Sequence, residues 1–159
     1  MVQNYSKRIL ITGASGQLGS SLIQYLKQYY KVFSTSHTGN NPVDITDRNK
    51  LDAILSAIEP DYIINCAAFT NVDKNETKKD HAYSVNVMGI KNIIALSNKN
   101  TKIVHLSSDY IFDGKRESYT ENDLPNPLSY YGKIKLESEN ILRSSNRCYL
   151  IFRSSVIYN

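Results

Sequence analysis

Residues 8–19 read RILITGASGQLG, and this stretch carries the strongest indication of the architecture. Residues 8–12 form a short apolar run, which predicts a strand buried on both faces. Gly13, Gly16 and Gly19 follow where that strand turns into a helix, predicted over residues 16–30. Glycines at this point let the backbone approach phosphate groups, and the helix start offers them free N–H groups. The stretch therefore predicts a dinucleotide-binding turn.

The rest of the chain alternates short apolar runs with helical patterns. Strands are predicted over residues 31–34, 61–65, 102–106 and 148–152, helices over residues 47–59, 79–98 and 129–143, and loops over residues 35–41 and 109–128. Strands separated by helices indicate βαβ units with right-handed crossovers. We therefore expect an α/β fold, a Rossmann-type doubly wound parallel sheet, with residues 1–159 as one NAD(P)-binding domain.

Composition and charge exclude several classes of protein. The formal net charge is only +4, and the lysines and arginines are scattered rather than clustered as in a nucleic-acid-binding block. No apolar run approaches the ~20 residues that cross a bilayer, and residues 1–8 lack the apolar core of a signal peptide. Cys66 and Cys148 lie in apolar segments and are expected to be buried thiols in a reducing compartment. A cytoplasmic protein without nucleic-acid or membrane partners is expected.

Polar candidates fall directly after the predicted strands. Gly13 follows the first strand, residues 66–68 follow the third, and residues 107–109 follow the fourth. In parallel sheets, ligands bind in the crevice beyond the carboxyl ends of the strands. We therefore expect these residues to meet at one edge of the sheet. The three histidines show no metal-ligand spacing, so no metal site is expected.

The type of dinucleotide stays open. The second strand ends in residues 34–37, STSH, without the acid that would hold the ribose hydroxyls of NAD and without an arginine. Hydroxyl groups there can bind a 2′-phosphate, so the choice between NADP and NAD is left open. Asp44 is expected either to approach the adenine or to be only a turn residue, and Asn86 either to position a water or to bond a neighbouring backbone. The predicted cofactor-binding residues are Gly13, Ser15, Gly16, Gln17, Leu18, Asp44, Ile45, Cys66, Ala67, Ala68, Asn86, Tyr131 and Lys135.

Tyr131 and Lys135 stand four residues apart and therefore share a face of the last predicted helix. A free tyrosine has a pKa near 10, too high for acid–base work at neutral pH. Lowering that pKa by about three units takes about 4 kcal/mol. An ammonium roughly 4 Å away supplies this at an intermediate dielectric, if the pair is partly desolvated. Alone, this spacing is usually an exposed helical pair; the upstream motifs make a catalytic pair the preferred interpretation.

Ser108 supplies a hydroxyl at the end of the fourth strand. It is expected to donate a hydrogen bond to a substrate carbonyl and polarise it. Its neighbour Ser107 is an alternative for this role. The predicted catalytic residues are therefore Ser108, Tyr131 and Lys135, which would help to deliver a hydride and a proton to a carbonyl group.

Several motifs resemble, in order, those of the extended short-chain dehydrogenases/reductases. They are the glycine spacing, Asn65-x-Ala67-Ala68, Ser107-Ser108-Asp109 and Tyr131-x-x-x-Lys135. Longer segments resemble the dTDP-4-dehydrorhamnose reductase family: residues 65–74 (NCAAFTNVDK), 107–114 (SSDYIFDG), 126–128 (NPL) and 152–155 (FRSS). The resemblance covers nearly the whole chain.

The resemblance implies reduction of a dTDP-linked 4-keto-6-deoxy sugar by NADPH or NADH, in a family that feeds bacterial cell-surface polysaccharide synthesis. It makes Tyr131 the proton donor, and Lys135 the group that lowers its pKa and binds the nicotinamide ribose. Ser108 stands where the family often has threonine. The family continues beyond this point with a smaller C-terminal substrate domain, which is expected to be missing here. Only part of the nucleotide-sugar pocket is then encoded.

Two alternatives remain open. A nucleotide-sugar epimerase or dehydratase of the same superfamily keeps NAD tightly bound, and the missing acid after the second strand mildly disfavours it. A non-catalytic NADP-binding subunit is the other alternative, since the regulatory subunit of methionine adenosyltransferase resembles this reductase family. The expected partners are a nucleotide-sugar substrate and, as an open option, a second copy in a homodimer.

Overall fold

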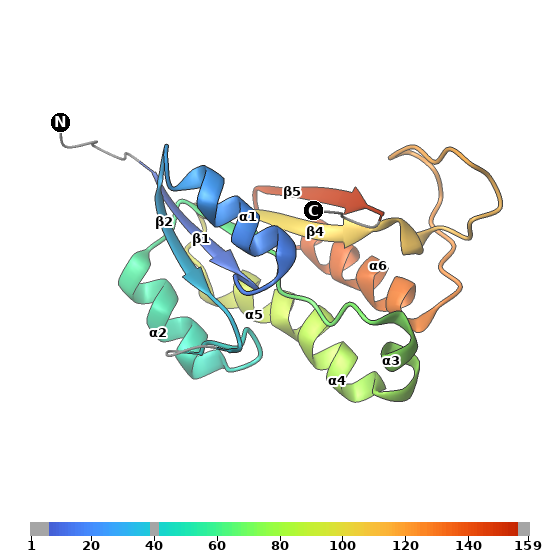
Figure 1. Ribbon diagram of the computed structural model, residues 1–159, viewed down its shortest axis with the longest axis horizontal. Helices are drawn as coiled ribbons and strands as arrows, with labels where there is room; N and C mark the ends of the chain where they lie inside the picture. Colours follow the sequence, from blue (N-terminus) through green and yellow to red (C-terminus); the bar gives the residue numbers. More distant parts are fainter. Residues whose placement is uncertain (1–6, 39–41, 156–159) are drawn as a thin grey trace.

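The structure is a computed structural model that describes residues 7–38 and 42–155. Its centre is a five-stranded sheet in the order β2-β1-β3-β4-β5, with all neighbouring strands parallel (Figure 1). The strands are β1 (Arg8–Thr12), β2 (Lys31–Thr35), β3 (Tyr62–Asn65), β4 (Lys102–Ser108) and β5 (Tyr149–Ser154). The helices are α1 (Gln17–Leu26), α2 (Arg48–Ile58), α3 (Val72–Thr77), α4 (Lys79–Tyr83), η1 (Ser84–Met88), α5 (Gly89–Leu96), η2 (Asp109–Ile111) and α6 (Tyr130–Arg143). The predicted Rossmann-type α/β fold is confirmed.

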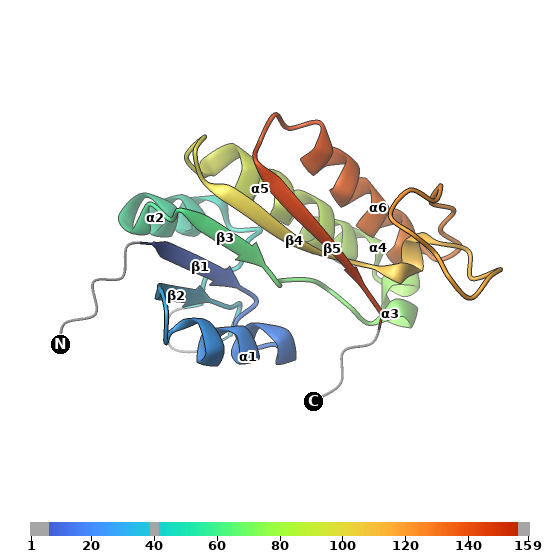
Figure 2. The same cartoon turned by 90° about the horizontal axis from the view of Figure 1, so that it is seen from above.

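Helices cover both faces of the sheet. α1 lies over one face beside β1 and β2, while α2, α5 and α6 lie over the other (Figure 2). The main core lies between the sheet and this second group of helices, and its fully buried side chains include Leu10, Leu51, Ile63, Ile103 and Leu142. The strand order reverses between β1 and β3, which is where doubly wound sheets bind their ligands.

Local signals explain the elements near the amino terminus. β1 is buried on both faces, as its apolar run predicts. Asp47 caps α2 by accepting the N–H of Lys50 at 3.1 Å, and Leu51 and Leu55 bury the apolar stripe of that helix. The helix ends at Ile58, and its C-cap Glu59 has a φ of 44°, in the left-handed region. The predicted start, face and end of α2 are therefore confirmed to within a residue.

The helix predicted over residues 79–98 is wrong in detail. It is divided into α4, the π-helical turn η1 and α5, and it ends at Leu96. No sequence pattern predicted α3, where the side chain of Asn71 accepts the N–H of Lys74 at 2.8 Å. This short helix lacks an apolar stripe, so its tertiary contacts, rather than periodicity, keep it in place.

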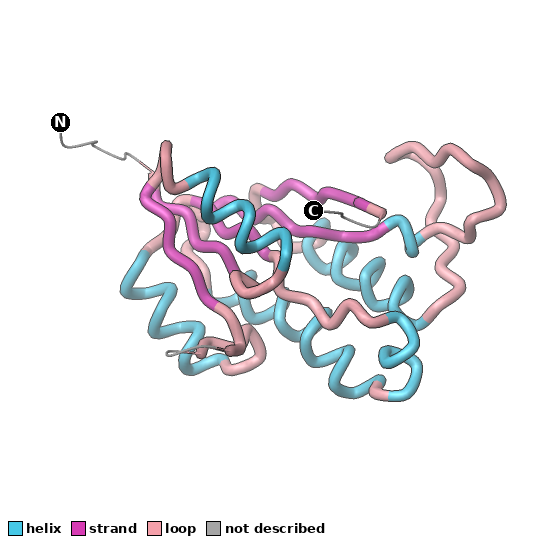
Figure 3. The backbone as a smooth tube through the Cα atoms, in the orientation of Figure 1, coloured by secondary structure: helices cyan, strands magenta, loops and turns pink. Residues whose placement is uncertain are grey.

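Other boundaries shift by a few residues. α1 ends at Leu26 rather than at residue 30, and β4 continues through Ser108. The loop predicted over residues 109–128 begins with η2, and Figure 3 shows the long irregular segment between η2 and α6. Cys148 was expected to be buried and is exposed, because it precedes the edge strand β5. Residues 1–6, 39–41 and 156–159 lie outside the described residues, so the limits of the predicted domain and part of the loop over residues 35–41 stay predictions.

Candidate active site

The glycine bend between β1 and α1 fits closely against the turn that follows β3. Gly13 has a φ of 69°, and a β-carbon on it would lie 2.5 Å from the backbone nitrogen of Ala67. Gly16 is the N-cap of α1 and provides no capping side chain. The N–H groups of the first helical turn are therefore available to an anionic ligand, such as a pyrophosphate.

A cavity of about 490 Å³ extends from this bend across the carboxyl ends of the strands to α6. Gly13 and Gly16 line one part of it, and Ser108, Tyr131 and Lys135 line another. A smaller cavity of about 220 Å³ shares the glycine bend. Of the predicted residues, the larger cavity is lined by Gly13, Gly16, Gln17, Leu18, Cys66, Ala68, Ser108, Tyr131 and Lys135, and the smaller one by Gly13, Ser15, Gly16, Asp44, Ile45, Cys66, Ala67 and Ala68.

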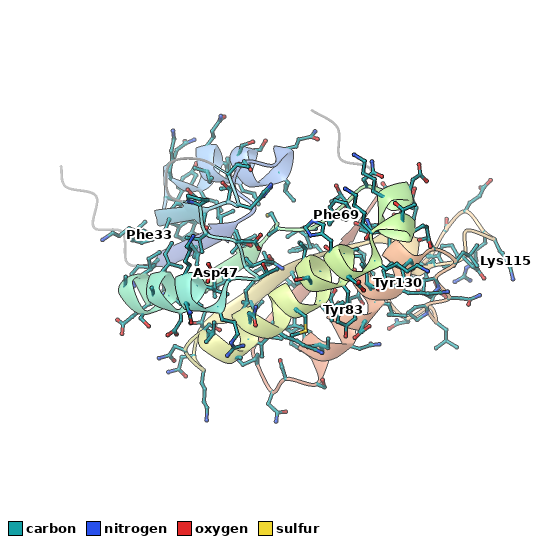
Figure 4. The ribbon with its side chains drawn as sticks, turned by 90° about the horizontal axis from the view of Figure 1, so that it is seen from below. Phe33, Asp47, Phe69, Tyr83, Lys115 and Tyr130 are labelled. Atoms are coloured by element: carbon teal, nitrogen blue, oxygen red, sulfur yellow. The ribbon has the colours of Figure 1, made fainter. Side chains whose placement is uncertain are left out.

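Asn86 is the one predicted site residue that lines neither cavity. Its Oδ1 accepts the N–H of Phe69 at 2.9 Å, and its Nδ2 donates to the Phe69 carbonyl at 3.1 Å. The second of its two predicted roles, a bond to a neighbouring backbone, is the one observed. Asn75, which the sequence analysis missed, also donates to the Phe69 carbonyl at 3.1 Å. These two amides fix the segment between β3 and α3, on which Figure 4 labels Phe69.

Asp44 forms the expected turn and also faces a cavity, while its approach to an adenine stays a prediction. Its Oδ1 accepts the N–H of Thr46 at 2.8 Å, as in a turn, and the residue also lines the smaller cavity. Ser36 and His37, at the end of β2, line that cavity as well. Their place after a strand was the signal that pointed to them, although they were not included among the predicted cofactor-binding residues.

Ser108 and Ser107 point in different directions. Successive residues of a strand face opposite sides of a sheet, so Ser107 lies on the same face as His105, which bonds Ser138 of α6 at 3.0 Å. The Oγ of Ser108 accepts the N–H of Tyr110 at 3.2 Å and donates to Oδ1 of Asp109 at 3.1 Å. Both serines line the larger cavity, and Ser108 is the one whose hydroxyl interacts with Tyr131 and acts to lower the pKa of that phenol.

The environment of Tyr131 corrects one expectation. Burial raises the pKa of the Tyr131 phenol above its ordinary value, although the nearby Ser108 hydroxyl acts in the opposite direction. The Nζ of Lys135 donates to the carbonyl of Leu106 at 2.5 Å, and burial lowers its pKa to about 8, although Glu139 acts to raise it. In the protein alone, the pKa of the phenol is therefore raised rather than lowered as expected, because desolvation is the largest of its causes.

α6 is held in place on both sides of Lys135. Ser129 caps the helix by accepting the N–H of Gly132 at 3.0 Å. Further along, Ser138 bonds His105 of β4, and the fully buried Glu139 accepts from Arg153 of β5 at 2.8 Å. Because both ends of its inner face are anchored, the helix carries Tyr131 and Lys135 to the cavity in one orientation.

Neither a metal centre nor a membrane-spanning helix is found in the described part of the chain. Within residues 7–38 and 42–155, no group of three or more His, Cys, Asp and Glu side chains is arranged to hold a metal ion. In the same ranges, no helix combines the length and the apolarity needed to cross a bilayer.

The parallel sheet, its glycine bend and the Ser108, Tyr131 and Lys135 set together define a short-chain dehydrogenase/reductase type of Rossmann protein. More narrowly, the chain belongs to the family described as the RmlD substrate binding domain, whose model matches residues 7–159.

Known relatives share about half of their length with this chain. The dTDP-4-dehydrorhamnose reductase of Aggregatibacter actinomycetemcomitans is 41% identical over 152 residues, which cover 93% of this chain and 51% of the relative. Methionine adenosyltransferase 2 subunit beta of Bos taurus is 33% identical over 159 residues, which cover 96% of this chain and 48% of the relative. The crystal structure of dTDP-4-dehydrorhamnose reductase from Bacillus anthracis in complex with NADP has a TM-score of 0.88 and 35% identity, covering 96% of this chain and 54% of that one.

Proposed function

We propose that this chain is the cofactor-binding and proton-donating part of an NAD(P)H-dependent reductase that acts on a nucleotide-linked 4-keto-6-deoxy sugar. One observation carries the proposal: a single cavity joins the glycine bend at Gly13 to the side chains of Ser108, Tyr131 and Lys135. The identity of 41% with a dTDP-4-dehydrorhamnose reductase supports the choice of substrate class.

The residues present suit a dinucleotide. A side chain at Gly13 would overlap the Ala67 backbone, and Gly16 leaves the start of α1 uncapped, so this region forms a cradle of backbone N–H groups. Lys135 lies on the opposite part of the same cavity, where it would hold the nicotinamide ribose. When bound, the reduced nicotinamide supplies the hydride for the reaction.

The chain's own residues would handle the proton and the developing charge. As the substrate carbonyl carbon gains a hydride, its oxygen becomes negative, and hydrogen bonds from Ser108 and Tyr131 stabilise that charge. Tyr131 then gives its proton to the oxygen, which leaves an alcohol and a phenolate. The raised pKa of Tyr131 keeps the phenol protonated beforehand, as a proton donor requires. The ammonium of Lys135 would stabilise the phenolate until solvent returns the proton.

The test compares Tyr131→Phe with Tyr130→Phe in the full-length product of the source gene. Tyr130 precedes Tyr131 in α6 and does not line the larger cavity, so it is a matched control. Oxidation of NADPH is followed with a dTDP-linked 4-keto-6-deoxy sugar. We expect Tyr131→Phe to lose about 10²–10⁴-fold in turnover and much less in NADPH affinity, with Tyr130→Phe close to wild type. Equal rates in the two variants would remove Tyr131 from the mechanism.

A second candidate is a non-catalytic NADP-binding subunit. The identity of 33% with methionine adenosyltransferase 2 subunit beta, over 96% of this chain, favours it. This candidate requires tight NADP binding without keto-sugar reduction by the full-length protein, together with an enzyme that co-purifies. A retained and reducible NAD in the purified protein would instead support the epimerase or dehydratase alternative.

A further inference from the structure

Gly132 lies next to Tyr131 in the first turn of α6 and carries no functional group of its own. It is buried and donates its N–H to Oγ of Ser129 at 3.0 Å. Alanine is a better residue than glycine inside a helix by roughly 0.5–1 kcal/mol. Helix formation therefore does not explain why a glycine occupies this position.

A contact between two backbones explains it. A β-carbon on Gly132 would come closer than 3.0 Å to the carbonyl oxygen of Tyr110, which belongs to η2, and would lie 3.0 Å from Cβ of Pro127. The Tyr110 carbonyl is a backbone group and cannot rotate aside as a side chain does. Because ordinary carbon contacts begin at about 3.5 Å, an alanine would push α6 and η2 apart by roughly 1 Å.

Each backbone at this contact carries one of the predicted catalytic residues. On the side of η2, the Oγ of Ser108 accepts the N–H of Tyr110 at 3.2 Å. On the side of α6, the ring of Tyr131 meets the Tyr110 ring edge-on, with 5.7 Å between the centroids. A change in the spacing of the two backbones therefore changes the distance between the hydroxyls of Ser108 and Tyr131.

We propose that Gly132 is a positioning residue, which sets the spacing between Ser108 and Tyr131 by letting α6 touch the carbonyl of Tyr110. The inference rests on the proposed carbonyl reduction. A misplacement of about 1 Å can cost on the order of 10²-fold in rate. Gly13 and Gly16 lie at β1 and α1, away from this contact, so the glycine bend at the other part of the cavity does not depend on it.

The test compares Gly132→Ala with Lys133→Ala, the exposed next residue of the same helix, in the full-length protein. Three quantities are measured: NADPH affinity, keto-sugar turnover, and the titration of the Tyr131 phenol by ultraviolet difference spectroscopy against the matching Tyr131→Phe proteins. We expect Gly132→Ala to lose about 10²-fold in turnover, to lose much less in NADPH affinity and to shift the phenol titration, while Lys133→Ala changes none of them. Wild-type turnover and titration in Gly132→Ala would overturn the proposal.

Two results would need a further measurement: an inactive wild-type protein and a Gly132→Ala variant that does not fold. A wild-type protein that binds NADPH but reduces no keto sugar counts against the proposed function, and the phenol titration then decides the role of Gly132 without any turnover. If Gly132→Ala does not fold, Ser129→Ala replaces it. That change removes the hydrogen bond to the Gly132 N–H and adds no atom, so it loosens the turn that holds Gly132 against Tyr110. A shifted phenol titration with retained NADPH affinity in Ser129→Ala supports the proposal, and an unchanged titration overturns it.

Discussion

The side-chain nitrogen of Lys135, on α6, lies 2.5 Å from the carbonyl oxygen of Leu106, on β4. This hydrogen bond connects the helix that carries Tyr131 to the strand that ends at Ser108. Lys135 as a whole is 2% exposed, and burial lowers the pKa of its amine to about 8. The protein therefore keeps a poorly solvated cation beside the cavity, which is costly for folding and useful for binding a charged cofactor.

Replacing Lys135 should affect the stability of the fold and the affinity for the cofactor in opposite directions. The pKa of Lys135 is about 8 in the folded protein, and its ordinary value is 10.5. Between these two pH values the amine therefore holds a proton in the unfolded chain that it has lost in the folded chain. Stability should therefore rise with pH across this window, by at most on the order of 3 kcal/mol. We expect Lys135→Met to remove that rise, to fold at least as stably as wild type at pH 7, and to bind NADPH more weakly. Denaturant unfolding from pH 7 to 10.5 and an NADPH titration measure these effects; an identical pH profile in both proteins would contradict the assignment.

His105 should make the protein sensitive to acid. Its ring bonds Asn65 at 3.1 Å and Ser138 at 3.0 Å, and burial, followed by the charge of Lys135, lowers its pKa well below the ordinary value. Below about pH 6.5 the unfolded chain gains a proton that the folded chain excludes, so stability should fall with decreasing pH, by up to about 1.4 kcal/mol per pH unit. We expect His105→Gln to flatten this slope, and the exposed His37→Gln to retain it. Urea unfolding between pH 5 and 7.5 tests the difference; an unchanged slope in His105→Gln would count against it.

Gly114 provides a control for a substitution at Gly13 in the glycine bend, because the two residues have nearly the same backbone conformation. Their φ angles are 69° and 68°, but a β-carbon on Gly114 would meet nothing within 4 Å, whereas one on Gly13 would overlap the Ala67 backbone. We expect Gly114→Ala to cost only the backbone term, about 1–2 kcal/mol. Gly13→Ala should lose more stability and should also lose NADPH affinity. Chemical denaturation and an NADPH titration provide the comparison, and equal losses in both variants would show that the close approach to Ala67 has no energetic role.

Glu139 should be far more important to stability than an exposed carboxylate. It is fully buried, and its Oε2 accepts from Arg153 at 2.8 Å and from Arg143 at 3.2 Å. Removing one partner of a buried ion pair typically costs about 3–5 kcal/mol. We expect Glu139→Gln to approach that loss with little dependence on salt. Glu59→Gln, which affects an exposed pair with Arg8 at 3.6 Å, should change stability by about 1 kcal/mol or less. Similar unfolding midpoints for the two variants would contradict this expectation.

Some site residues were predictable because their signals are local. Gly13 follows a strand and opens a helix, and Ser108 ends a strand, so both lie at the carboxyl edge of any parallel sheet. Tyr131 and Lys135 share a helix face because of their spacing. The order of these motifs was sufficient to predict that they line one cavity, and the structure shows that they do.

Other features depend on contacts between distant parts of the chain. The Nζ of Lys135 bonds a carbonyl 29 residues away, and the Asn86 side chain bonds the backbone of Phe69, 17 residues away. Neither partner is visible in a periodic pattern. The exposure of Cys148 likewise follows from its place beside an edge strand, which only the strand order reveals.

Hydrophobic periodicity and the backbone freedom of glycine act over a few residues, so the primary structure alone specified the α/β class, the glycine bend and the residues that face the cavity. Tertiary packing decided the ionisation of Tyr131 and Lys135. It also decided the π-helical turn at η1 and the contact of Gly132 with Tyr110. Burial and the electric field at a side chain depend on every element around it, and those elements come together only when the sheet and its helices assemble.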